Sequence, residues 1–109
     1  MKHVTTADKS LLIGDEAAVL LVEYAALLGQ RQSADDVRLR AYGDDGDPVE
    51  VIFLLNSGTT LMVESSGSTV PEPDNTAALE YMRSRIQFLT SPPEVQPMEA
   101  DARTSEWDG

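Results

Sequence analysis

The chain has 109 residues, with 8 Lys or Arg against 19 Asp or Glu, and its formal net charge at pH 7 is −11. Hydrophobic residues make up 41% of the chain, a globular value that excludes wholesale disorder. The acidic balance argues against direct nucleic-acid binding, which needs a clustered basic face. No apolar run approaches the roughly 18 residues of a membrane span, so no membrane association is expected.

Cysteine and histidine usage limits the chemistry further. The absence of cysteine excludes disulfides, thiol catalysis and cysteine-ligated zinc. The single histidine, His3, lies near the N-terminus, so a histidine-based metal site or catalytic triad lacks its residues. We therefore expect no cofactor and no metal. The N-terminal segment has no signal-peptide core and neither end carries a lipidation motif, which predicts a cytoplasmic protein.

The first elements in chain order are a flexible start and a long helix. Residues 1–9 are polar and expected to be flexible. The apolar run at residues 11–13 fits either a short N-terminal strand or an extended lead-in. A helix is predicted over residues 16–29, with Asp15 as its N-cap and Gly29 at its end. It is apolar nearly all round, which indicates either a central helix or a subunit interface.

Three strands are expected next, at residues 37–42, 48–55 and 59–65, as an antiparallel meander. Two loops, 44–46 and 56–58, place a glycine last, where a three-residue hairpin loop needs the left-handed conformation. Paired residue numbers then sum to 90 in the first hairpin and to 114 in the second. These registers gather one apolar face, which includes Val37, Phe53 and Leu61.

The opposite face of the predicted meander mixes apolar residues with arginine and tyrosine. Arg38 is expected opposite Ile52, which in turn is expected opposite Met62. Arginine, tyrosine and methionine are enriched in the cores of protein interfaces. The face therefore predicts a partner-binding surface, unless a helix of this chain covers it. Its residues are Arg38, Arg40, Tyr42, Ile52, Leu54 and Met62.

A second helix is predicted to begin after a cap at Asp74 or Asn75 and to run to about Leu89. Residues 92–109 contain five acids and one arginine, which predicts a disordered acidic tail. Trp107 within it is either a docking motif or an unselected tail end. The resulting organisation is one α+β domain over residues 10–91: a helix, a three-stranded antiparallel meander and a helix.

Acidic side chains supply the only candidate chemistry. The aspartates at 44, 45 and 47 do not match a calcium loop, because no acid closes it, and they are typical of turns. Glu50 and Glu64 are expected to face each other, either as a catalytic pair or, with Arg40, as an ion-paired surface. No nucleophile lies beside a base and no phosphate-binding glycine loop appears. We expect no enzymatic activity.

Three functions remain open at this point. The first is a small acidic protein-interaction module, an adaptor or regulator, which binds another protein or a copy of itself. The second is an acidic inhibitor or nucleic-acid mimic that binds a basic site, as the net charge suggests. The carboxylates of this chain, however, are dispersed along the sequence, whereas a mimic should array them on one continuous surface. The third, an enzyme acting alone, rests only on Glu50 and Glu64.

Overall fold

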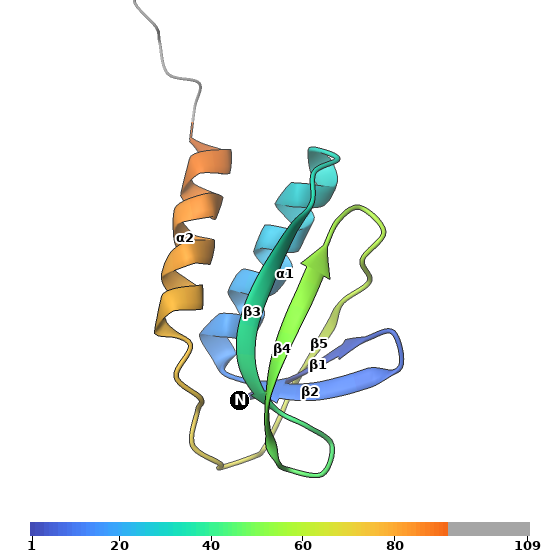
Figure 1. The fold of residues 1–109 in the computed structure, drawn as a ribbon, viewed down its shortest axis with the longest axis vertical. Helices are drawn as coiled ribbons and strands as arrows, with labels where there is room; N and C mark the ends of the chain where they lie inside the picture. The colour runs from blue at the N-terminus through green and yellow to red at the C-terminus, as the bar shows by residue number, and fades with distance from the viewer. Residues whose placement is uncertain (92–109) are drawn as a thin grey trace, which may run out of the picture.

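The computed structural model describes residues 1–91, so the predicted acidic tail and Trp107 lie outside the described residues. Two helices and a five-stranded antiparallel sheet form an α+β fold (Figure 1). Both predicted helices are present. The elements are β1 (Lys2–Thr6), β2 (Lys9–Ile13), α1 (Asp15–Gln30), β3 (Asp35–Tyr42), β4 (Pro48–Leu55), β5 (Met62–Ser65) and α2 (Thr76–Thr90).

The sheet has the strand order β4-β3-β2-β1-β5, and every neighbouring pair is antiparallel. β2 meets β3 at a single residue pair, Leu12 with Tyr42. Beyond that pair the two strands separate, and the β1–β2 hairpin runs crosswise to β3 and β4 (Figure 1). The sheet is therefore bent, and most of β3 has no strand on its β2 side.

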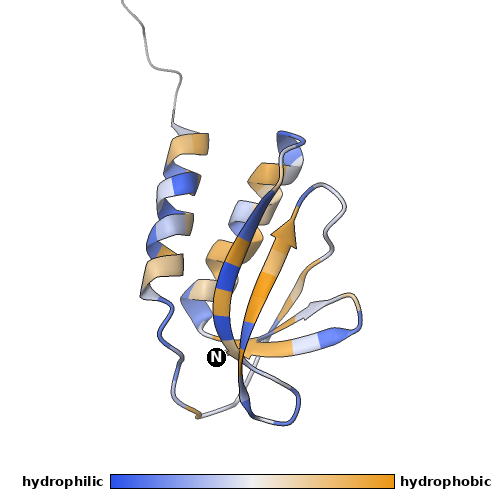
Figure 2. Ribbon diagram, in the orientation of Figure 1, coloured by the Kyte–Doolittle hydropathy of each residue, from blue (hydrophilic) through white to orange (hydrophobic). Residues whose placement is uncertain are grey.

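Both helices pack on one face of the sheet. Alternate residues of β3 point into that face and are buried, whereas the residues between them are exposed. Figure 2 shows this alternation along β3, while β4 is apolar along most of its length. Val19 and Val22 of α1 remain exposed, so this helix is not surrounded on all sides. The buried core includes Val4, Ile13, Leu21, Tyr24, Leu28, Leu39, Phe53, Leu55 and Met82.

The first predicted hairpin is confirmed. Val37 pairs with Phe53 and Leu39 with Val51, so the paired numbers sum to 90. Gly46 has a φ of 85°, the left-handed conformation that this loop requires. Turn chemistry and hydrophobic alternation therefore determined both the loop and the register.

The second predicted hairpin is wrong, and so is the three-stranded meander. β5 pairs with β1 at the far edge of the sheet, with Val63 opposite Val4. Gly58 does not adopt a positive φ, so the loop after β4 does not return the chain alongside it. The alternative partner is favourable because Val4 is fully buried between neighbouring strands. An apolar strand pairs where its side chains are best buried.

The N-terminal residues are part of this sheet. Residues 1–9, which were expected to be flexible, form β1 and begin β2. Residues 11–13 belong to β2, so this apolar run is a strand and not an extended lead-in. The N-terminal amino group contacts the Asp15 carboxylate at 2.8 Å, and this contact lowers the pKa of Asp15. Gly14, not Asp15, is the N-cap of α1.

Candidate functional site

The face of β3 and β4 that points away from the helices is open to solvent. Ile52 and Leu54 are 55% and 64% exposed, which is unusual for large apolar side chains on neighbouring positions of one strand face. Arg38 lies directly opposite Ile52, and Arg40 lies opposite Glu50. The fold thus brings together five of the six predicted partner-binding residues: Arg38, Arg40, Tyr42, Ile52 and Leu54.

Met62 does not belong to this cluster. It lies on β5, opposite Thr5 of β1, at the other edge of the sheet. The predicted row from Arg38 through Ile52 to Met62 is therefore wrong in its second step. The same rearrangement places Glu64 opposite His3 and far from Glu50 in the strand order. The two carboxylates cannot form a pair, which removes the basis for the predicted catalytic or ion-paired row.

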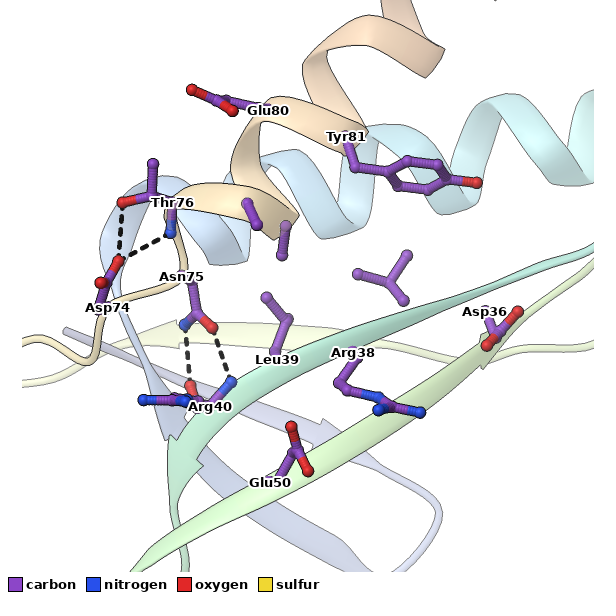
Figure 3. A pocket seen from close by; sticks show the side chains of 13 residues that line it. Asp36, Arg38, Leu39, Arg40, Glu50, Asp74, Asn75, Thr76, Glu80 and Tyr81 are labelled. Atoms are coloured by element: carbon purple, nitrogen blue, oxygen red, sulfur yellow. Dashed lines mark hydrogen bonds between the residues drawn. The ribbon is translucent and has the colours of Figure 1, made fainter.

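Helix α2 lies along β3 and leaves a groove of about 720 Å³ between them (Figure 3). Asn75, at the start of α2, closes one end of it. Its side-chain oxygen accepts a hydrogen bond from the Arg40 N–H at 2.7 Å, and its NH₂ donates to the Arg40 carbonyl at 2.9 Å. The amide group therefore takes the place of a neighbouring strand at this point of β3.

This contact also fixes the direction of the main-chain groups in β4. The N–H and C=O of Arg40 point away from β4, so Arg40 and Glu50 form a non-hydrogen-bonded pair. The N–H and C=O of Glu50 consequently point away from β3, and those of Ile52 and Leu54 do the same two and four residues further on. In agreement, the Leu54 carbonyl accepts a hydrogen bond from the Thr59 hydroxyl at 2.9 Å, outside the sheet.

The other end of the groove is tied by a cluster that the sequence analysis missed. Tyr24 of α1 and Tyr81 of α2 both donate hydrogen bonds to the Asp35 carboxylate at the start of β3. Their rings meet edge to face, and the two ring centroids are 6.4 Å apart. A tyrosine on the buried face of a predicted helix was the available signal, because its hydroxyl needs a partner. The sequence alone gave no indication of which residue that partner is.

The electrostatics of this cluster are those of a structural link. Burial raises the pKa of Asp35, but hydrogen bonds from Tyr24, Tyr81 and the Asp36 N–H outweigh burial and the pKa lies below its usual value. Burial, followed by the hydrogen bond to Asp35, raises the pKa of Tyr24. The Asp35 hydrogen bond, followed by burial, raises the pKa of Tyr81. All three groups therefore titrate away from neutral pH, which is unsuited to proton transfer.

A second depression lies beside the outer edge of β4, with a volume of about 610 Å³. We call it the β4 slot. One wall is β4 itself, and the other is the β1–β2 hairpin, through Thr6, Ala7, Lys9 and Leu11. The loop with Asp44 and Asp45 lies at one end.

Within residues 1–91, no three potential metal-ligating side chains gather at one point. The Asp45 carboxylate instead accepts the Asp47 N–H at 3.0 Å, as in an ordinary turn. In the same part of the chain, no helix has the length and apolar character that crossing a membrane requires.

Comparisons with protein-family models, curated proteins and solved structures find no match to this chain.

Proposed function

We propose that this protein is a small, acidic, non-catalytic interaction module of the cytoplasm, an adaptor or regulator that binds another protein chain through the open face of β3 and β4. The single observation that carries the proposal is the exposure of Ile52 and Leu54 on a sheet whose other face is already covered by two helices. The core does not need these side chains, and leaving them in water is unfavourable unless a partner covers them.

The surroundings of the two apolar residues support a protein partner. Arg38 lies beside Ile52 on the next strand, and Arg40 follows at the next position of the same face. Neither arginine takes part in an ion pair within residues 1–91, where the paired cations are the N-terminal amino group, Lys2 and Arg83. Apolar residues flanked by available guanidinium groups are typical of protein interfaces, in which arginine is enriched.

The test is the double substitution Ile52→Glu with Leu54→Glu. Both side chains point into solvent, so the variant should fold and melt close to the wild type. Two carboxylates on this face should abolish binding, because an interface core cannot hold unpaired charges. Cross-linking and affinity capture with quantitative mass spectrometry measure partner binding, and light scattering measures self-association.

Met62→Glu is the matched control, because Met62 is 51% exposed at the opposite edge of the sheet. It should keep every partner that the wild type binds. High salt should weaken capture little if the apolar residues dominate, whereas an acidic inhibitor would lose its partner. If the double variant captures the same partners as the wild type and has the same mass in solution, this face is not the binding site.

A further inference from the structure

We propose that the outer edge of β4 binds one extended segment of a partner protein, which joins the sheet as an added antiparallel strand and ends in basic residues. The inference rests on the proposed function and specifies how the partner is held. The face bearing Ile52 and Leu54 supplies side-chain contacts in that function. The edge of the same strand supplies main-chain hydrogen bonds.

The main-chain groups available on this edge follow from the register. The N–H and C=O of Glu50 and of Ile52 point away from β3, as does the N–H of Leu54. Within residues 1–91, no hydrogen bond outside the sheet ladder involves the main chain of Glu50 or Ile52. A strand placed alongside would therefore meet a ready pattern of alternating donors and acceptors.

Edge strands usually carry features that prevent such pairing, and β4 has few of them. Lysine, inward-pointing charges, bulges and short length are the common devices. β4 is eight residues long, and Glu50 is its only charged residue. Pro48 lacks an N–H, but it stands at the first position and leaves the rest of the edge unaffected. This edge therefore retains the character of a pairing template.

The β4 slot favours a single strand over a second folded copy. The β1–β2 hairpin stands across from β4 and forms the other wall of the slot. A β4 strand from a second copy would arrive with its own β3 attached on its far side, in the direction of this hairpin. A free extended segment has no such neighbour. It can lie between the two walls and pair with β4 along one of its edges only.

The chemistry of the slot indicates the composition of that segment. Side chains on its inner side would contact Leu11 and Phe53, and those on its outer side would lie beside Ile52 and Leu54, so apolar residues fit both. Among the residues that line the slot, Asp44, Asp45 and Glu50 outnumber the one cation, Lys9, and the two aspartates lie in the loop just before β4. Arg40, opposite Glu50, belongs to β3 and does not line the slot. An antiparallel segment brings its C-terminal end to the start of β4, and basic residues at that end complement the carboxylates.

A synthetic peptide, acetyl-TVTVTVKK-amide, is the probe. In two-dimensional NMR of the full-length protein, it should shift the amide signals of Glu50 and Ile52 saturably and slow the exchange of their N–H protons. Replacing the two lysines with glutamates should weaken binding about tenfold or more at low salt, because the end of the slot is acidic. No saturable binding at millimolar peptide overturns the proposal.

Two N-methylated forms of the peptide test the main-chain pairing directly. One carries methyl groups on the odd-numbered residues and the other on the even-numbered residues. An added strand uses only one edge, so one form should bind and the other should fail. Equal binding of both forms would show that side chains alone hold the peptide. This result would overturn the added strand while leaving the proposed binding face intact.

The protein variant Ile52→Pro removes one outward N–H at an edge position, where proline is tolerated. It should weaken peptide binding about tenfold, the effect of one lost hydrogen bond. Ile52→Val, which keeps the N–H, should bind as the wild type does. If Ile52→Pro fails to fold, the N-methylated peptides decide. A stable dimer that shields the Ile52 amide would also overturn the proposal, because a second copy would then occupy the edge.

Discussion

The β-hairpin of β3 and β4 has two outer edges, and the protein treats them differently. On the β3 side, β2 pairs with Tyr42, the Asn75 amide binds the main chain of Arg40, and the groove beside α2 borders the remainder. On the β4 side, the Thr59 hydroxyl bonds to the Leu54 carbonyl at the end of the strand. Two positions of the β3 edge, Tyr42 and Arg40, thus have partners within the chain, whereas the outward main-chain groups of Glu50 and Ile52 on the β4 edge have none within residues 1–91.

This difference separates stability from function. The Asn75 contact satisfies main-chain groups of Arg40 that would otherwise be costly, because Asn75 is only 9% exposed and both hydrogen bonds are partly buried. The β4 edge and its outer face contribute little to the core, since Ile52 and Leu54 remain in water. We therefore expect substitutions near the β3 edge to change the free energy of unfolding. Those on the outside of β4 should change binding.

The largest expected contrast lies between neighbours on β4. Phe53 is 4% exposed and Ile52 is 55% exposed, on opposite faces of one strand. Phe53→Ala should lower the free energy of unfolding by about 3–5 kcal/mol through lost burial and a cavity. Ile52→Ala should lower it by less than about 1 kcal/mol. Urea denaturation measures both, and similar losses in the two variants would mean that the outer face is part of the core.

The next effect concerns the contact of Asn75 with the edge of β3 at Arg40. Asn75→Ala removes both hydrogen bonds to the Arg40 main chain and leaves a partly buried N–H and C=O without these partners. The free energy of unfolding should fall by about 2–3 kcal/mol. Asn75→Asp keeps an acceptor for the Arg40 N–H, so its loss in the free energy of unfolding should be smaller. Equal stability of all three proteins in urea melts would contradict the role of Asn75 as a strand substitute.

A third effect tests the hydrogen-bonded cluster at the far end of the groove. The pKa of Asp35 lies below its usual value in the folded protein. The stability it contributes is therefore present above the unfolded-state pKa of about 3.9 and is lost as pH falls through the folded-state pKa. Asp35→Asn should cost about 1.5 kcal/mol at pH 7 and flatten the acid limb of stability against pH. An unchanged acid limb would mean that Asp35 is not the responsible group.

The smallest effect lies at the tip of the hairpin that walls the β4 slot. Ala7 has a φ of 53°, a left-handed conformation that costs alanine energy and glycine almost none. Ala7→Gly should raise the free energy of unfolding by roughly 0.5 kcal/mol, because relief of strain slightly exceeds the added chain entropy. Thermal melts would detect it, and a clear loss of stability would contradict the turn geometry.

Local chemistry explains which parts of this fold were predictable. The helices and the first hairpin follow from periodicity, capping and a glycine loop, all within short stretches of chain. The position of β5 depends on Val4, some 60 residues away in the sequence, and no local pattern encodes that pairing. The same applies to the link between Asp35 and Tyr81 and to the contact of Asn75 with Arg40.

The predicted partner-binding site was likewise correct only where it depended on local pairing. Arg38, Arg40, Tyr42, Ile52 and Leu54 came together because a single hairpin register places them. Met62 was assigned through the second hairpin, and its place changed with the strand order. The slot beside β4 could not be predicted, because its far wall comes from N-terminal residues that were expected to be flexible.

Residue-by-residue amide hydrogen exchange of the free protein tests the contrast between the two edges most directly. The N–H groups of Val51 and Phe53 pair with β3, whereas that of Ile52 points outward. We predict exchange about tenfold or more faster at Ile52 than at either neighbour, and slow exchange at Arg40, whose N–H is held by Asn75. Uniformly slow exchange along β4, or fast exchange at Arg40, would contradict the account in which Asn75 holds the β3 edge at Arg40 while the β4 edge is open.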